Sequence, residues 1–195
     1  MAVIEGLLGP HARISFTSAL INEPGNPRGN WHGDWPFNAQ RAGHLPSPYP
    51  VDVIFHITTL WMISPFNEET SGTYFIPGSH KRSSNPTGGP EENWTKPIEG
   101  EMNVTGSTGS VLIFDARLWH AVSVNHSDKP RVAVGIRFAP WWLNLDILMP
   151  GSEERKMMAD ELGLKENEVP RLNWKIYDNL PNEVKPLYRH WLHDR

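Results

Sequence analysis

The sequence contains no cysteine, and this absence removes several kinds of site at once. Disulfide bonds, thiolate metal sites and a cysteine nucleophile are all excluded. A metal ion in this protein must therefore be held by His, Asp or Glu side chains.

Positive charge is also scarce. The chain has 18 Lys and Arg against 22 Asp and Glu, which gives a formal net charge of −4. Proteins that bind nucleic acids neutralise phosphates with a basic surface, and this balance does not provide one. We therefore expect no nucleic-acid partner.

Long apolar runs are missing as well. No segment approaches the roughly 18 apolar residues that a membrane-spanning helix needs. Residues 1–10 also lack the basic segment that precedes the apolar stretch of a secretory signal. We expect a cytoplasmic protein with no membrane partner.

Turn residues and aromatic residues, in contrast, are abundant. The 195 residues include 18 Pro, 16 Gly and 9 Trp, a composition that favours short strands joined by many turns. Hydrophobic residues make up 38% of the chain, as in soluble globular proteins, and the length suits one domain. The composition therefore predicts a mainly β fold.

Several segments have the pattern of strands. Residues 12–22 are followed by a turn rich in Pro and Gly, and residues 72–80 end in a Pro-Gly turn. Residues 51–63 are β-branched or aromatic at both alternating positions, which predicts a central strand buried on both faces. Helical periodicity is almost absent before residue 150, so these strands predict a sandwich or a jelly roll.

The C-terminal part of the chain has a different character. Ser152 is a candidate N-cap for a helix that ends near Gly163, and a second short helix is predicted to begin near Pro181. We predict a core of residues 1–150 and a helical tail of residues 151–195 that packs on this core, in a single domain.

The predicted strand that begins at residue 131 has a face that needs a cover. Val132, Val134, Ile136 and Phe138 would form an apolar stripe along one face of this strand. Such stripes are normally buried. We expect the helical tail, or a second subunit in a homodimer, to cover this one.

Three side chains form a candidate metal site. His32 and Asp34 are two residues apart, so in an extended segment they point to the same side of the chain. His120, at the end of a long apolar strand, could supply the third ligand. Two imidazoles and one carboxylate on one face of a metal are typical of non-haem iron oxygenases.

Arg131 is a candidate for binding a dicarboxylate. It follows His120 across a turn at residues 125–130, so we predict that the two strands form an antiparallel hairpin and face one cavity. Ala133 and Gly135 lie on the same face as Arg131 and leave space in front of it. A guanidinium can hold a carboxylate through two hydrogen bonds, so a dicarboxylate cosubstrate would fit there.

Four segments together resemble the phytanoyl-CoA dioxygenase family of iron(II)- and 2-oxoglutarate-dependent oxygenases. The resemblance covers roughly residues 5–142. It implies a double-stranded β-helix, which is a cupin-like jelly roll. The segments are WHGDW at 31–35, EETSGTYFIPGSHK at 68–81, GSVLIFDARLWH at 109–120 and HAVSVNHSDKPR at 120–131.

The resemblance also implies an activity and its cofactors. The family's metal ligands fall on His32, Asp34 and His120, and its cosubstrate arginine falls on Arg131. The expected activity is hydroxylation of a small organic substrate with iron(II), 2-oxoglutarate and O2, with release of succinate and CO2. Family members often carry a small hydroxyl residue two positions after the distal histidine, whereas this chain has Val122 there.

Other interpretations of these residues stay open. Trp35, Phe37 and Trp61 could line a substrate pocket near the metal, or they could belong to the core. The chain could also be a non-catalytic jelly roll that binds a metal or a ligand, or a hydrolase or isomerase that uses zinc or manganese.

Overall fold

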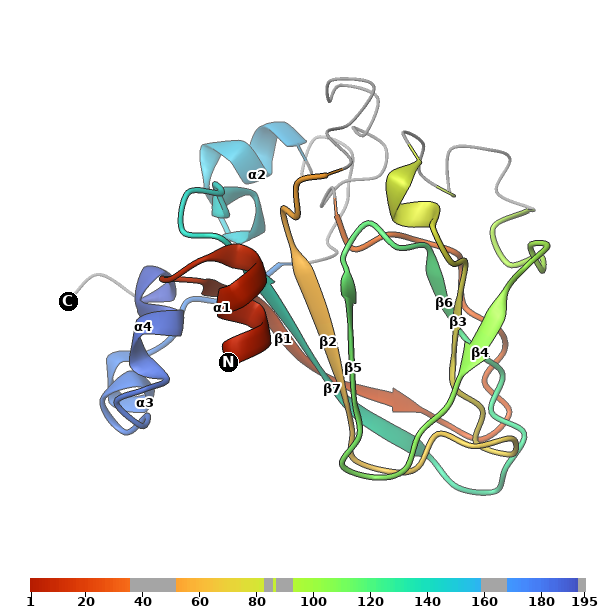
Figure 1. The fold of residues 1–195 in the computed structure, drawn as a ribbon. Helices are drawn as coiled ribbons and strands as arrows, with labels where there is room; N and C mark the ends of the chain where they lie inside the picture. Colours follow the sequence, from red (N-terminus) through yellow and green to blue (C-terminus); the bar gives the residue numbers. More distant parts are fainter. Residues whose placement is uncertain (36–51, 83–85, 87–92, 159–167, 193–195) are drawn as a thin grey trace.

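The chain folds into two antiparallel sheets that face each other (Figure 1), in a computed structural model that describes residues 1–35, 52–82, 86, 93–158 and 168–192. The larger sheet has the order β1-β7-β2-β5, and the smaller sheet has the order β4-β3-β6. The prediction of a mainly β fold is confirmed. The strands are β1 (Arg13–Asn22), β2 (Ile57–Met62), β3 (Thr73–Phe75), β4 (Met102–Val104), β5 (Val111–Asp115), β6 (His120–Val122) and β7 (Arg131–Ala139).

Short helices surround the sheets in the described residues. One precedes β1, one follows β3, and the others lie after β7. None of these helices is long and apolar enough to cross a membrane. They are α1 (Ala2–Leu8), η2 (Ser79–Lys81), η5 (Asp146–Leu148), α2 (Glu153–Met158), α3 (Trp174–Asp178), α4 (Lys185–Tyr188) and η7 (Arg189–Trp191).

The strand β2 occupies the central position that its composition predicts. It pairs with β5 on one side and with β7 on the other. Leu60 is buried toward the inside of the molecule, whereas its neighbour Trp61 is 44% exposed on the outer face. The expectation that both faces are buried is therefore wrong at Trp61, because one face of this sheet is partly open to solvent at that point.

The predicted hairpin between the strands of His120 and Arg131 is not formed. Strand β6 pairs with β3 in the smaller sheet, while β7 pairs with β1 and β2 in the larger one. Residues 123–130 thus cross from one sheet to the other. The Asn125 amide donates to the carbonyls of Asn22 and Lys129, so the crossing segment is tied to the end of β1.

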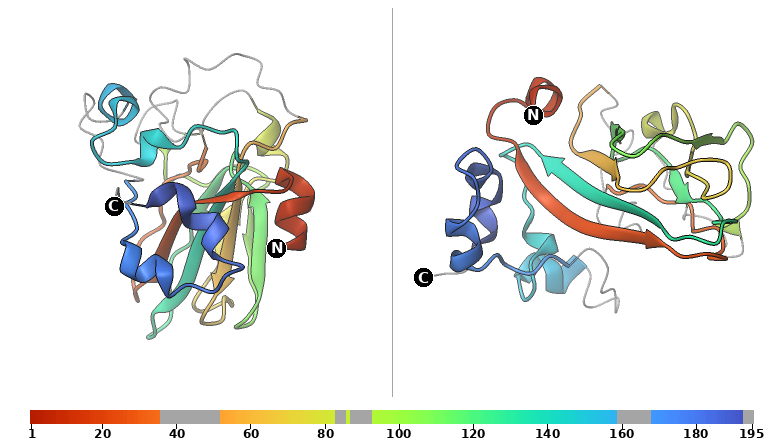
Figure 2. Two further views of the ribbon diagram at one scale, coloured as in Figure 1. Left: turned by 90° about the vertical axis from the view of Figure 1, so that its left-hand side faces the viewer. Right: turned by 90° about the horizontal axis from the view of Figure 1, so that it is seen from below.

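The apolar stripe on β7 is covered at one end. Phe138 is buried in a cluster with Ile4 and Leu8 of α1, and Leu187 and Tyr188 of the tail pack against the same cluster. Figure 2 shows the C-terminal helices beside β1 and β7. At this end the tail therefore contributes part of the cover, and α1, which the sequence pattern did not predict, contributes another part.

The tail is also anchored by a buried tryptophan. Trp191 is 2% exposed, and its Nε1 donates to the carbonyl of Ile14 in β1 at 2.6 Å. Ser152 accepts a hydrogen bond from the backbone of Arg155 at 3.0 Å, which confirms it as the cap of α2. The division into a core of residues 1–150 and a tail of residues 151–195 stays a prediction.

Candidate functional site

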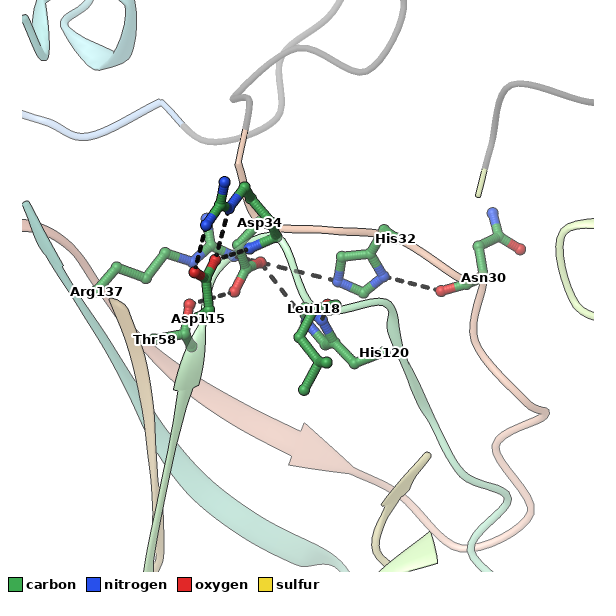
Figure 3. Close-up of polar contacts among 9 residues, drawn as sticks. Asn30, His32, Asp34, Thr58, Asp115, Leu118, His120 and Arg137 are labelled. Carbon is green, nitrogen blue, oxygen red and sulfur yellow. Dashed lines mark hydrogen bonds and ion pairs between the residues drawn. The ribbon is translucent and has the colours of Figure 1, made fainter. Parts of the chain in front are cut away.

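The three predicted metal ligands meet at one end of the space between the sheets (Figure 3). His32 and His120 exchange both backbone hydrogen bonds at 2.9 Å, so the segment that carries His32 lies along β6. The Nε2 atoms of His32 and His120 lie 3.9 and 3.7 Å from Oδ1 of Asp34. One possible ligand atom from each residue lies within 4.8 Å of the others, which is close enough for all three to bind one ion.

Both imidazoles are oriented by backbone carbonyls. Nδ1 of His32 lies 2.9 Å from the carbonyl of Asn30, and Nδ1 of His120 lies 2.8 Å from the carbonyl of Leu118. A carbonyl can only accept, so Nδ1 donates in each case and Nε2 keeps its lone pair. The two histidines therefore present Nε2 to the shared point, as metal-ligating histidines commonly do.

The carboxylate of Asp34 is held from the opposite sheet. Thr58 in β2 donates to Oδ2 at 2.6 Å, and Arg137 in β7 forms an ion pair with Oδ1 at 2.5 Å. Burial by itself raises the pKa of Asp34, but Arg137, the two histidines and Thr58 outweigh burial and hold this pKa well below its ordinary value. Asp34 is therefore charged at neutral pH although it is only 5% exposed.

His120 is neutral at the same pH. Its burial, helped by the neighbouring His32, lowers its pKa to about 4. A neutral imidazole is the form that binds a metal. The set of two nitrogen donors and one charged oxygen fits iron(II), and these three residues could hold it.

A cavity of about 520 Å³ extends from these ligands between the sheets and reaches Arg131. Ala133, Gly135 and Arg137 line it together with Arg131, as the alternation along β7 predicts. The cavity is lined mostly by apolar side chains, including Leu60, Phe66 and Phe114. It therefore offers a largely apolar space with charged groups at defined points.

Arg131 fits the predicted role of an anchor for a carboxylate. Its Nη1 donates to the carbonyl of Gly72, and its guanidinium lies over the ring of Phe66 at 4.2 Å. Its Nε is buried and has no hydrogen-bond partner among the described residues. Burial lowers the pKa of Arg131 to about 10, so the side chain stays charged, with a donor that a bound carboxylate could satisfy.

Of the three predicted substrate residues, the two that the structure describes, Trp35 and Trp61, do not line this cavity. Trp35 stacks on Phe55 with ring centroids 5.2 Å apart and is not among the lining residues. Trp61 lies on the outer face of the larger sheet, where its Nε1 donates to Thr59 at 3.0 Å. Phe37 lies outside the described residues.

Sequence reasoning missed two residues of the site, Thr58 and Arg137. They are cross-strand neighbours on β2 and β7, and both side chains hold Asp34. A signal for Arg137 was present, because it lies six residues after Arg131 and so on the same face of the strand. The position of Thr58 depends on which strand β2 pairs with, and the sequence pattern does not contain that information.

Solved structures share this fold. The 2-oxoglutarate-dependent epimerase SnoN from nogalamycin biosynthesis matches with a TM-score of 0.52 and 23% identity, over 71% of this chain and 53% of that one. EctD from S. alaskensis, solved with 2-oxoglutarate and 5-hydroxyectoine, matches with a TM-score of 0.51 and 20% identity, over 71% and 48% of the two chains. The predicted double-stranded β-helix is confirmed by these matches.

Curated proteins of similar sequence are longer than this chain. An uncharacterized protein of Mycobacterium tuberculosis, Rv1501, is 33% identical over 51% of this chain and 34% of its own length. The dioxygenase cdmA of Talaromyces verruculosus is 26% identical over 95% of this chain and 64% of its own length. The dioxygenase af480 of Aspergillus fumigatus is 28% identical over 67% of this chain and 38% of its own length. The chain thus spans between about one third and two thirds of the length of these relatives.

The family model for phytanoyl-CoA dioxygenase (PhyH) matches residues 7–133. This range contains all three candidate metal ligands and Arg131. The chain belongs to the phytanoyl-CoA dioxygenase family.

Proposed function

We propose that this protein is an iron(II)- and 2-oxoglutarate-dependent oxygenase that hydroxylates a small organic substrate. The observation that carries the proposal is the convergence of His32, Asp34 and His120 at one end of an apolar cavity that also contains the buried Arg131. A metal-ligand set and a cation for a dicarboxylate in one cavity are what this chemistry requires.

The metal would be held by Nε2 of His32, Nε2 of His120 and Oδ1 of Asp34. When bound, iron(II) supplies the activation of O2 that is coupled to oxidative decarboxylation of 2-oxoglutarate, so that 2-oxoglutarate, O2 and R–H give succinate, CO2 and R–OH. With only these three side chains as ligands, bound iron(II) would keep coordination positions for the cosubstrate and O2.

The remaining residues orient the reactants and exclude water. Arg131 would pair with the carboxylate of 2-oxoglutarate that is distant from the metal. Thr58 and Arg137 hold the Asp34 carboxylate in one orientation. The apolar walls at Leu60 and Phe114 keep water away from the reacting atoms.

The volume of the cavity limits what can bind. About 520 Å³ lies within the range of ordinary small-molecule sites, and the cosubstrate must occupy part of it. A small substrate, or one that enters only with its reacting end, is therefore favoured. Because a solved neighbour is described as an epimerase, product analysis has to separate hydroxylation from epimerisation.

The test is turnover of the cosubstrate. The full chain is loaded with iron(II) without oxygen, mixed with 2-oxoglutarate and a pool of small metabolites, exposed to O2, and assayed for succinate. We expect succinate from the wild type, none from Asp34→Ala, and unchanged formation from Asp128→Ala, which alters an exposed aspartate in the 123–130 connection.

Two outcomes would contradict the proposal. A protein that binds metal but neither binds 2-oxoglutarate nor forms succinate would be a binding jelly roll. A protein that converts a substrate with zinc or manganese and without 2-oxoglutarate would be a hydrolase or an isomerase.

A further inference from the structure

The guanidinium of Arg131 cannot satisfy a carboxylate by itself. Its Nη1 already donates a hydrogen bond to the carbonyl of Gly72. An ionised carboxylate has about four acceptor sites, and two hydrogen bonds from the rest of the guanidinium would leave about two of them unfilled. In a largely apolar cavity such unfilled acceptors are costly. A further donor beside Arg131 is therefore needed.

Thr73 is placed to be this donor. It directly follows Gly72, the residue to which Arg131 donates, and it lines the same cavity. Its side chain is buried, with Thr73 only 5% exposed. Within the described ranges its hydroxyl has no hydrogen-bond partner, so its proton is available to a ligand.

The other hydroxyl groups considered either donate to another acceptor or lie too far from Arg131. Ser123 donates to the carbonyl of Gly72 at 2.5 Å, and Thr58 donates to Asp34. Ser18 also lines the cavity, but it pairs with Gly135, which is four residues along β7 from Arg131. At about 3.3 Å per residue this is roughly 13 Å away, which is too far to share a carboxylate.

The sheet register explains why the hydroxyl stands at residue 73. Thr73 is the direct cross-strand partner of Val122, and both side chains line the cavity. Side chains of such a pair lie on one face of the sheet, about 5 Å apart. Val122 on β6 has only methyl groups and cannot donate a hydrogen bond. The hydroxyl on this face comes instead from Thr73 on the neighbouring strand β3.

We propose that Thr73 is a cosubstrate-binding residue, whose hydroxyl donates to the carboxylate of 2-oxoglutarate that pairs with Arg131. This inference rests on the proposed function. It implies that the two sheets share the anchor, with the cation on β7 and the hydroxyl on β3.

The test measures binding of 2-oxoglutarate by calorimetry, without oxygen, to the full chain loaded with nickel(II) so that no turnover occurs. Thr73→Val keeps the shape of the side chain and removes the donor. We expect it to raise the Kd for 2-oxoglutarate about 10-fold or more, as for the loss of one hydrogen bond to a charged group, and to leave nickel affinity unchanged. The control Thr108→Val makes a similar change at an exposed threonine that does not line the cavity, and it should bind like the wild type.

A rescue distinguishes hydrogen bonding from packing. Val122→Ser in the Thr73→Val background returns a hydroxyl to the same face, and we expect it to restore most of the affinity. If Thr73→Val does not fold, as judged by circular dichroism, Thr73→Ser should bind like the wild type and Thr73→Ala should bind weakly.

The outcomes separate this inference from the proposed function. A wild type that does not bind 2-oxoglutarate would overturn the proposed function. A wild type that binds it, with Thr73→Val binding equally tightly or with no rescue by Val122→Ser, would overturn only the role of Thr73.

Discussion

Asp34 differs from the two histidines in how it is held. The histidines are oriented by carbonyls two residues away in their own segments, whereas both oxygens of Asp34 contact side chains of the opposite sheet. Arg137 in turn lies over the ring of Phe16 at 4.6 Å, which restricts its position. The geometry of the metal site thus depends on residues that are not ligands.

A substitution of Arg137 should therefore weaken metal binding. Arg137→Met leaves Oδ1 of Asp34 without its ion pair, and we expect nickel affinity to fall about 10- to 100-fold, as for other residues that orient metal ligands. Calorimetry with nickel(II) measures this effect. Arg137→Lys, which keeps the charge, should lie between Arg137→Met and the wild type.

The control for this substitution is Arg189→Met, which removes an exposed arginine far along the chain and should bind nickel normally. Equal or tighter binding by a folded Arg137→Met protein would show that the positive charge of Arg137 opposes the metal more than its contact orients Asp34.

At the scale of elements, the strand pair β3 and β4 depends on a residue without a side chain. A Cβ added to Gly72 would lie 1.9 Å from the carbonyl oxygen of Val104, an impossible contact with backbone. The carbonyl of Gly72 also accepts from Arg131 and Ser123. Gly72 therefore determines both the spacing of the smaller sheet and the position of the cosubstrate anchor.

Gly72→Ala should disturb both properties. Overpacking of this kind costs about 1–3 kcal/mol, which in a protein of this size lowers the melting temperature by roughly 2–12 °C. Binding of 2-oxoglutarate should weaken as well, because the partner of Arg131 moves. Thermal unfolding and calorimetry measure the two effects.

Gly6→Ala is the matched control, because nothing lies within 4 Å of its added Cβ in α1. Alanine is the better helix former, so this variant should be at least as stable as the wild type. A Gly72→Ala protein with normal stability and normal binding would contradict the assigned role of this glycine.

At the scale of the whole molecule, two histidines that are not metal ligands, the buried His56 and the half-buried His190, should make stability depend on pH. Burial, helped by Arg137, lowers the pKa of His56 from 6.5 to about 3, and burial, helped by Arg13, lowers that of His190 from 6.5 to about 4. The unfolded chain thus binds protons first. The part of the stability that depends on these neutral histidines is therefore present above about pH 6.5 and is lost as the pH falls toward 4.

Urea unfolding at pH 7.5 and at pH 5.0 should show this loss. A pH of 5.0 is about 1.5 units below the pKa of a histidine in the unfolded chain. Each of the two histidines should therefore lower the free energy of unfolding by about 2 kcal/mol. His190→Gln should reduce the dependence on pH, while the exposed His126→Gln should leave it unchanged. Equal stability at both pH values would show that these histidines titrate normally.

The tail should be required for a stable, soluble molecule. It supplies Leu187 and Tyr188 to the cluster around Phe138, and Trp191 is buried against β1. Each buried apolar side chain contributes on the order of 1.5–3 kcal/mol, so deletion of residues 151–195 should lower the melting temperature and cause aggregation.

Solubility, thermal unfolding and the mass of the intact protein in solution test this prediction, and the mass also tests the alternative of a homodimer. A truncated protein that is soluble, monomeric and equally stable would show that the apolar face of β7 does not need to be buried by the tail.

The sequence by itself determined the chemistry of the candidate site and the class of fold. The lack of cysteine restricts metal ligands to His, Asp and Glu, and the spacing of His32 and Asp34 directs both to one side of an extended segment. The same alternation places Arg131, Ala133 and Gly135 on one face of β7. These are local properties of the backbone, so they can be read without knowing which strands are neighbours.

Only the tertiary structure decided how the strands are paired and therefore what surrounds each ligand. The turn before Arg131 was visible in the sequence, but its strand pairs in the other sheet, and Trp61 faces outward. Likewise Arg137 reaches Asp34 only because β7 and the segment of residues 30–34 face each other across the cavity. Such contacts join residues far apart in the chain, and the free energy that selects them comes from the packing of the whole core rather than from any one segment.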